Sequence, residues 1–260
     1  MPRLVLLAHP AVRSAVAREL GRDVEYHVSL GSTQTRARTI AEDAAARGIV
    51  VADEQSAGQG THGRSWHAAK GTSLLASWIV RPAPLAPALY AALAGVGIAR
   101  ALDRLGVGSS TLKWPNDVEL DGRKVAGALA NATSDGRGGV LVLGIGINVH
   151  QRTSDFPADL VATSLAMAGH DIDRLALLAR LTAELDRLER AAEREDAMDE
   201  WRSRSTLIGK SVVVRPAGGE DARPGRSFAG TATAIDDEGA LLVHTASGVE
   251  RVVTGDVRLL

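Results

Sequence analysis

The segment Gly58-Gln59-Gly60-Thr61-His62-Gly63-Arg64-Ser65-Trp66 has the residue types that bind an anion. Glycines at this spacing let the backbone approach a ligand closely and present N–H groups to negative charge. The spacing also matches the dinucleotide fingerprint, which needs a helix after the glycines and an acidic residue about 20 positions further on. Residues 71–80 instead predict a second strand, and no Asp or Glu occurs between Glu54 and Asp103. The segment therefore predicts a phosphate-rich small ligand, not a dinucleotide fold.

A second candidate segment contains two of the few lysines in the chain. Of 30 Lys and Arg side chains, only Lys70, Lys113, Lys124 and Lys210 are lysines. Two of them fall in Lys113-Trp114-Pro115-Asn116-Asp117 and Gly122-Arg123-Lys124-Val125-Ala126-Gly127. A lysine ammonium neutralises phosphate oxygens as a compact charge, and a nearby carboxylate holds a metal ion or accepts a proton. We interpret the two runs as a phosphate site. The alternative is a turn with solvated charges, with the lysines retained by chance.

Two further motifs each allow two interpretations. Gly31-Ser32-Thr33-Gln34 begins a predicted helix, so its hydroxyls either cap that helix or bind a polar ring of a ligand. The strand Gly144-Ile145-Gly146-Ile147-Asn148 contains two glycines, which indicate either a bulge or a close approach of something to the backbone. Asn148 at its end could bind the edge of an adenine.

Several elements must position these motifs. Residues 1–27 predict a short strand and a helix over 11–20 that Gly21 closes, and they are too few for a winged-helix domain. Apolar spacing and capping signals predict further helices at 32–47, 84–106 and 173–202. Strands are predicted at 48–53, 71–80, 111–114, 118–120, 124–131 and 139–148, with turns at Asp121-Gly122 and 134–139. Beyond Gly209, strands at 211–215, 227–235, 240–245 and 249–253, with a loop at 218–225, predict a small β-barrel.

Composition excludes several classes of protein. The net charge of −1 argues against a general nucleic-acid binder, and the absence of cysteine excludes disulfides and thiolate metal sites. The slightly apolar N-terminus is too short for a signal peptide, and no apolar run approaches the roughly 18 residues of a membrane span. We therefore expect a cytoplasmic protein with no membrane partner.

Taken together and in this order, the motifs resemble those of biotin protein ligases. The resemblance runs from about Ser32 to the C-terminus, and the Lys113–Asp117 run is its most specific part. It implies an α+β fold: a mixed sheet with helices, like that of class II aminoacyl-tRNA synthetases, followed by a small SH3-like β-barrel. The expected domains are residues 1–206, which bind biotin and ATP, and residues 207–260, which form the barrel.

The resemblance also implies a two-step reaction. The biotin carboxylate attacks the α-phosphate of ATP to give biotinyl-5'-AMP and pyrophosphate, and a lysine of a biotin carboxyl carrier protein then takes the biotin. Lys124, Lys113 and Asp117 are the implied catalytic residues, with Asp117 also an expected Mg²⁺ ligand. The implied biotin-binding residues are Ser32, Thr33, Gln55, Gly58, Gln59, Gly60, Thr61, Lys124 and Gly127. The implied nucleotide-binding residues are Gly63, Arg64, Trp66, Lys113, Asn116 and Asn148, while Trp114 is expected to line the pocket.

The sequence departs from the family pattern at three positions. Gln59 and Thr61 replace basic residues of the loop, and Asn131 replaces an acidic residue. We hypothesise that the loss at Thr61 weakens retention of the adenylate. No DNA-binding domain is expected, and a homodimer is common among relatives. The open alternatives are a ligase for lipoate or another acyl group, and a catalytically weak biotin-binding regulatory protein.

Overall fold

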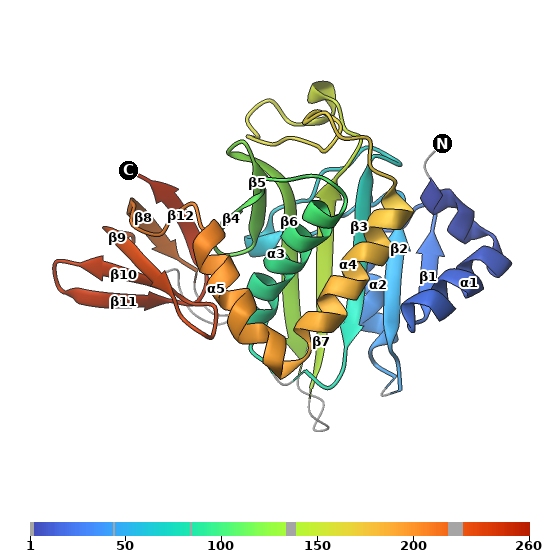
Figure 1. Ribbon diagram of the computed structural model, residues 1–260, viewed down its shortest axis with the longest axis horizontal. Coiled ribbons are helices and arrows are strands. Elements are labelled where there is room, and N and C mark those ends of the chain that lie inside the picture. Colours follow the sequence, from blue (N-terminus) through green and yellow to red (C-terminus); the bar gives the residue numbers. More distant parts are fainter. Residues whose placement is uncertain (1–2, 44, 84, 134–138, 218–225) are drawn as a thin grey trace.

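The computed structural model describes residues 3–43, 45–83, 85–133, 139–217 and 226–260, which form two sheets (Figure 1). The larger sheet is mixed, because its first two strands are parallel and the other neighbours are antiparallel. Its order is β1 (Val24–His27), β2 (Gly48–Ala52), β3 (Ser73–Val80), β7 (Val140–Asn148), β6 (Arg123–Thr133), β5 (Asp117–Leu120) and β4 (Thr111–Lys113). The predicted α+β class with a mixed sheet is confirmed.

The smaller sheet lies at the C-terminal end of the chain and is wholly antiparallel. Its order is β11 (Gly248–Val252), β10 (Leu241–Thr245), β9 (Phe228–Ile235), β8 (Ser211–Pro216) and β12 (Gly255–Leu259). Strand β12 was not predicted, because its short alternating run has no β-branched residue except Val257. The predicted loop 218–225 and the turn residues 134–138 lie outside the described residues.

The helices are α1 (Pro10–Leu20), α2 (Thr33–Ile40), α3 (Pro87–Arg104), α4 (Arg174–Leu188) and α5 (Arg194–Arg204), with 3-10 turns at Arg3–Ala8, Thr61–Gly63, Thr153–Asp155 and Ala191–Glu193. Gly21 ends α1 in the left-handed conformation, as predicted. Helix α3 is buried over most of its length, also as predicted. We keep the division at residues 206 and 207 as a proposal; it falls between α5 and β8.

Alternation along the central strand β7 gives the sheet two different faces. Leu141, Leu143, Ile145 and Ile147 belong to the main core with α3 and α4, which cover one face in Figure 1. Val140 and Val142 point the other way and pack with Ala37 and Ala41 at the end of α2. Further along the same face, Gly144 and Gly146 have no side chains. This face is therefore filled at one end and open at the other.

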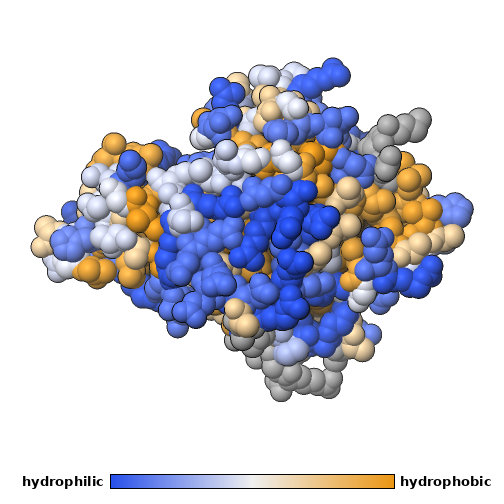
Figure 2. All heavy atoms as spheres, in the orientation of Figure 1, coloured by the Kyte–Doolittle hydropathy of each residue, from blue (hydrophilic) through white to orange (hydrophobic). Residues whose placement is uncertain are grey.

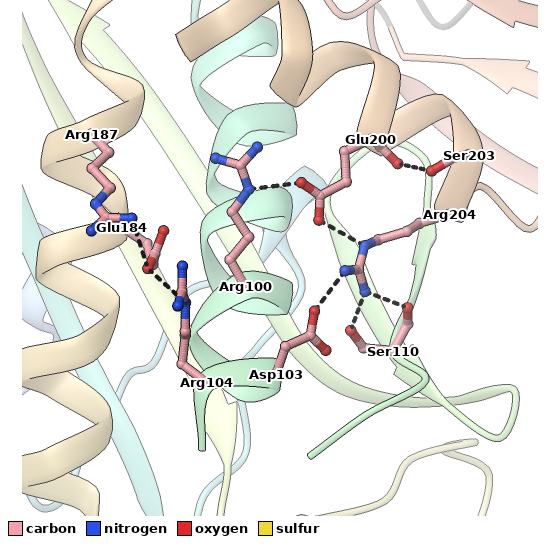
Figure 3. Close-up of polar contacts among 9 residues, drawn as sticks. All are labelled: Arg100, Asp103, Arg104, Ser110, Glu184, Arg187, Glu200, Ser203 and Arg204. Carbon is pink, nitrogen blue, oxygen red and sulfur yellow. Dashed lines mark hydrogen bonds and ion pairs between the residues drawn. The ribbon is translucent and has the colours of Figure 1, made fainter. Parts of the chain in front are cut away.

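Polar contacts join α3 to α4 and α3 to α5 on the face of the larger sheet that these helices cover (Figure 3). Arg100 of α3 donates to Glu200 of α5 at 2.7 Å, and Arg204 of α5 lies 2.6 Å from Asp103 of α3. Figure 2 shows hydrophilic side chains gathered over the middle of this face. The helical face is thus a solvated exterior, and the functional site must be sought on the opposite face.

Two predicted helices are shorter in the structure. The helix predicted to reach residue 47 ends at Ile40. Ala41 is the last residue of this segment that packs against Val140 and Val142. The Asp43 side chain then accepts a hydrogen bond from the Ala45 N–H, which forms a turn. The helix predicted at 173–202 is divided between Leu188 and Arg194. Among the residues whose burial the structure describes, the series of buried residues stops at Leu188 and resumes at Ala197, so these residues form no continuous apolar stripe for one long helix.

Candidate active site

A cavity of about 840 Å³ opens on the face of the larger sheet opposite α3 and α4. It is lined by most of the residues that the sequence singled out: Ser32, Thr33, Gln55, Gln59, Gly60, Thr61, Arg64, Trp66, Lys113, Asn116, Asp117, Lys124, Gly127 and Asn148. Of the predicted site residues, Gly58 and Gly63 do not line it. The tertiary fold thus brings together motifs that are more than 100 positions apart in the sequence.

One end of the cavity is a network of neutral polar groups. Ser32 caps α2 by accepting from the Thr35 N–H, so the capping interpretation of its hydroxyl is confirmed. The Gln55 Oε1 accepts from both the N–H and the hydroxyl of Thr33, at 2.7 and 2.9 Å. The Ser77 hydroxyl donates to the Thr33 hydroxyl at 2.9 Å. These contacts fix hydroxyl and amide groups where a polar ring could bind.

Gln34 is a cavity residue that sequence reasoning did not assign. Its side chain is almost wholly buried, and its Nε2 donates to the Val142 carbonyl and to Asn131 Oδ1, both at 2.9 Å. A Cβ at Gly144 would lie 2.4 Å from the Gln34 Oε1, so the glycine leaves room for this side chain. The glycine at position 144 was the available signal, because it indicates a close approach to the strand.

The glycine segment crosses the cavity as a tight loop. Gly60 N–H donates to the Arg64 carbonyl at 2.7 Å, and Trp66 N–H donates to the Gly58 carbonyl at 3.0 Å. A Cβ at Gly58 would lie 2.6 Å from the Trp66 carbonyl oxygen. The glycine at position 58 therefore lets the loop close against Trp66, and its expected contact with biotin remains a prediction. Gln59 accepts from Arg38 at 2.7 Å, so the loop is held against α2.

The Trp66 ring lies directly over the sheet. A Cβ at Gly146 would lie 2.5 Å from the ring, and one at Gly127 would lie 3.3 Å from it. The two glycines on adjacent strands therefore make room for the indole, and the close-approach interpretation of the 144–148 strand is supported. The Trp66 Nε1 is buried with no hydrogen-bond partner among the described residues. This flat ring offers a stacking surface inside the cavity.

Lys124 lines the cavity beside an acidic and an aromatic side chain. Its Nζ lies 2.6 Å from Asp117 Oδ1 and 5.5 Å from the centre of the Trp66 ring. Its backbone is fixed on both sides, because its N–H donates to the Val161 carbonyl and its carbonyl accepts from Thr163. The ammonium is thus positioned by an opposite charge and an aromatic face.

Lys113 begins the Lys113–Asp117 run and also lines the cavity. Its Nζ is 3.6 Å from Glu119, whose side chain is mostly buried. Asn116 donates from its side-chain amide to the Ala128 carbonyl and accepts on its own carbonyl from the Ala128 N–H. This pairing fixes the turn that carries both Lys113 and Asp117. Glu119 lines the cavity and was not singled out from the sequence.

Trp114 differs from its expected position, and Asn148 lines the cavity with its side chain hydrogen-bonded to protein groups. Trp114 was expected to line the pocket, but its ring is buried away from the cavity and its Nε1 donates to the Gly239 carbonyl of the C-terminal unit at 3.0 Å. Asn148 borders the cavity, but its amide donates to the Thr163 carbonyl and its Oδ1 accepts from Gln151. Both polar atoms of the Asn148 side chain therefore bind protein groups, and its expected contact with nucleotide remains a prediction.

A buried ion pair supports the strand that leads into the site. The Arg174 Nη1 donates to Asp53 Oδ1 at 2.7 Å and to the Ser73 carbonyl at 3.0 Å. The Tyr26 hydroxyl donates to the second oxygen of Asp53, and burial together with this contact raises the pKa of Tyr26. Removing one member of such a buried network leaves an uncompensated charge. The network therefore fixes the backbone two residues before Gln55.

Two general features complete the description. Across the described ranges, no helix combines the length and apolar character of a membrane span. Within the same ranges, no group of three or more His, Cys, Asp or Glu side chains could hold a metal ion by itself. A divalent ion in this cavity would therefore need additional ligands, such as phosphate oxygens.

Comparison with known proteins shows what the two units are similar to. Residues 28–148 match the biotin/lipoate A/B protein ligase family, and residues 208–260 match the biotin protein ligase C-terminal domain. The chain is 33% identical over 270 residues to the bifunctional ligase/repressor BirA of Bacillus subtilis, covering 97% of this chain and 79% of that protein. It is 33% identical over 218 residues to a biotin–acetyl-CoA-carboxylase ligase of Mycobacterium tuberculosis, covering 80% of this chain and 77% of that protein.

Solved structures agree with these matches. The biotin protein ligase of Aquifex aeolicus in complex with biotin and ATP superposes with a TM-score of 0.72 at 28% identity, over 91% of this chain and 98% of that one. The enzyme of Leishmania major in complex with biotinyl-5-AMP gives a TM-score of 0.61 at 26% identity, over 88% of this chain and 98% of that one.

Proposed function

The chain belongs to the biotin protein ligase family, and on that premise we propose how its residues divide the reaction between them. The protein is an ATP-dependent ligase that activates biotin as biotinyl-5'-AMP and transfers it to a lysine. One observation supports the proposed division of roles. A single cavity joins a neutral polar end, a stacking ring and two lysines.

The neutral end suits the ureido ring of biotin. That ring carries N–H donors and a carbonyl acceptor but no charge, so it needs partners of both kinds without a counter-ion. Thr33, Gln55 and Ser77 supply hydroxyls and an amide in a fixed arrangement. The apolar part of biotin would then lie in the cavity between this end and Lys124, with its carboxylate toward that lysine.

The cationic end suits the first chemical step. A carboxylate oxygen of biotin forms a bond to the α-phosphorus of ATP, the bond from that phosphorus to the bridging oxygen breaks, and pyrophosphate leaves. Negative charge accumulates on phosphate oxygens, so preorganised cations stabilise the transition state most. We assign Lys124 to bridge the carboxylate and the α-phosphate, and Lys113 to steady the remaining phosphates.

The second step needs a neutral amine. The lysine amine of a carrier domain attacks the carboxyl carbon of biotinyl-5'-AMP, an amide bond forms, and AMP leaves with the bonding electrons. The Asp117 carboxylate is paired with Lys124. We assign it to orient or deprotonate the incoming ammonium of the carrier lysine. We assign the acceptor to a biotin carboxyl carrier protein domain.

The cavity contains carboxylate oxygens, which are the ligands that Mg²⁺ prefers. Asp117 and Glu119 are two residues apart on β5, and both line the cavity. Mg²⁺ commonly binds through one or two carboxylates together with substrate phosphates and water. The Asp117 carboxylate fits an ion that arrives with ATP, and its chemistry would be to neutralise phosphate charge, whereas Glu119 is paired with Lys113.

The test is release of pyrophosphate from ATP in the presence of biotin, of lipoate or of neither, followed by transfer to a carrier domain. Release with biotin alone and a labelled carrier support the proposal. Release with lipoate instead assigns the cavity to another acyl group, and tight binding of biotin without release assigns it to a sensor. Sedimentation analysis with and without DNA addresses the expected homodimer and the expected lack of DNA binding.

A further inference from the structure

One cationic side chain of the cavity comes from the smaller sheet and not from the larger one. Arg258 lines the cavity, yet it belongs to β12, the last strand of the C-terminal unit. Sequence patterns did not indicate this position, because the strand was not predicted and lies almost 200 positions beyond the glycine loop.

Strand alternation determines the direction in which Arg258 points. Val257 is buried in the interior of the small sheet, so Asp256 and Arg258 share the opposite face. Asp256 reaches the glycine loop, where its carboxylate lies 3.1 Å from the Arg64 guanidinium. A second contact, between the Thr254 hydroxyl and His62, joins the same two segments at 3.2 Å. The face that carries Arg258 is therefore the one docked on the loop.

The charge environment of Arg258 differs from that of the other cavity cations. Lys124 is paired with Asp117, Lys113 with Glu119, and Arg64 with Asp256. Within the described part of the chain, Arg258 forms no ion pair and no hydrogen bond through its guanidinium. It is the cavity cation whose charge is left uncompensated there.

The loop itself lacks positive charge where a phosphate ligand would need it. Position 59 is Gln and position 61 is Thr, and both line the cavity. The Gln59 side chain also accepts from Arg38, so a cation at position 59 would face another cation. The C-terminal unit thus brings an arginine to the cavity beside a loop that is uncharged at positions 59 and 61 and whose Arg64 is paired with Asp256.

We propose that Arg258 is a substrate-binding residue of this ligase that contacts the β- and γ-phosphates of ATP and the departing pyrophosphate. A guanidinium donates two parallel N–H groups to phosphate oxygens, which a lysine does not. The proposal rests on the proposed function, since it assigns the residue to ATP in that reaction. It makes the C-terminal unit a direct part of the nucleotide site.

The experiment compares Arg258→Ala, Arg258→Lys and the matched control Arg180→Ala in the pyrophosphate-release assay. Arg180 is exposed on α4, outside the cavity. Charged hydrogen bonds of this kind predict a rise of roughly tenfold in the KM for ATP and weaker product inhibition by inorganic pyrophosphate in Arg258→Ala. The KM for biotin should not change, Arg258→Lys should recover part of the loss, and Arg180→Ala should behave as the unmodified protein.

Three results would overturn the proposal. The first is an unchanged KM for ATP in Arg258→Ala. The second is an equal rise of both KM values with a lower melting temperature, which would indicate a structural role. The third is a rise only in the KM for the carrier, which would assign Arg258 to the protein substrate. If the unmodified protein releases no pyrophosphate with biotin, the proposed function fails, and titration of each variant with ATP still decides the role of Arg258.

Discussion

The ammonium of Lys124 lies 2.6 Å from a carboxylate oxygen of Asp117, and the two side chains come from the paired strands β6 and β5. Both side chains are partly exposed to the cavity, so the pair is accessible to substrate. The charge of Lys124 is thus held in place before any substrate arrives. Preorganisation of this kind avoids a reorganisation cost during the reaction.

Lys124→Ala should abolish most of the turnover. Removal of a preorganised charge from the transition state costs on the order of 10²–10³ in kcat. Pyrophosphate release with saturating biotin and ATP measures the effect. Lys210→Ala is the control, because Lys210 is exposed and lies outside the cavity. Turnover retained in Lys124→Ala would remove Lys124 from its assigned role.

Glu119→Gln should tighten the binding of ATP. Glu119 lies 3.6 Å from the Lys113 ammonium, so its charge competes with phosphate for that lysine. In Glu119→Gln, loss of this ion pair predicts a fall of roughly two- to fivefold in the KM for ATP. In Lys113→Ala, the KM for ATP should rise. A higher KM for ATP in Glu119→Gln would show that the carboxylate assists ATP, as a metal ligand does.

Thr61→Arg should slow the escape of biotinyl-5'-AMP. Thr61 lines the cavity, and its hydroxyl accepts from Arg64 at 2.9 Å. A second guanidinium at this position would bind the adenylate phosphate, with an expected reduction of escape of roughly tenfold. Biotin labelling of bystander lysines measures that escape, and Thr61→Ser serves as the control. Equal labelling by the arginine variant and the unmodified protein would refute the hypothesis that Thr61 weakens retention.

Gly146→Ala should displace the Trp66 ring and reduce activity. The new methyl group would lie 2.5 Å from the ring, and overpacking of this kind costs about 1–3 kcal/mol. The expected result is at least a roughly tenfold loss in biotin-dependent pyrophosphate release. Gly108→Ala is the matched control, because a Cβ there meets nothing within 4 Å. Equal activity in the two variants would show that the ring position is not needed.

Acid should destabilise the protein partly through His150. Burial, with a smaller contribution from the charge of Arg174, holds the pKa of His150 below its ordinary value of 6.5, although Asp171 and Asp173 oppose the shift. Below about pH 6.5 the unfolded chain takes up a proton that the folded protein does not, so the free energy of unfolding falls as the pH falls toward the folded pKa. Above that pH the contribution is constant. His150→Gln should reduce the slope in urea denaturation between about pH 7 and pH 5, and an unchanged slope would contradict the assignment.

Much of the fold could be predicted because local signals were strong. Gly21 marked the end of α1, and Asp121-Gly122 marked the tight turn between β5 and β6, where both residues have positive φ. The failures occurred where packing overrides local pattern. The charged run after Leu188 looks helical in isolation, but no buried stripe continues through it.

The candidate site likewise contains residues that local sequence signals identified and residues that they did not. Lys113, Lys124 and the glycine loop were identified from the scarcity of lysine, the spacing of the glycines and the order of the motifs along the chain, which resembles biotin protein ligases. Gln34, Glu119 and Arg258 were missed, because a single polar residue in a helix or strand carries no spacing signal. Trp114 was placed wrongly for a related reason: its motif is specific, but the direction of one side chain depends on what packs around it.

The sequence by itself determined which reactive side chains are available, namely the two lysines, the glycine loop and the hydroxyl and amide groups of Thr33 and Gln55, and most of the strands and helices along the chain. The tertiary structure decided which of these groups meet. It paired Lys124 with Asp117, placed Trp66 over Gly146 and brought Arg258 to the cavity from the C-terminal unit. The physical reason is that local sequence fixes backbone propensity and charge, whereas contacts between distant strands depend on how the whole core packs.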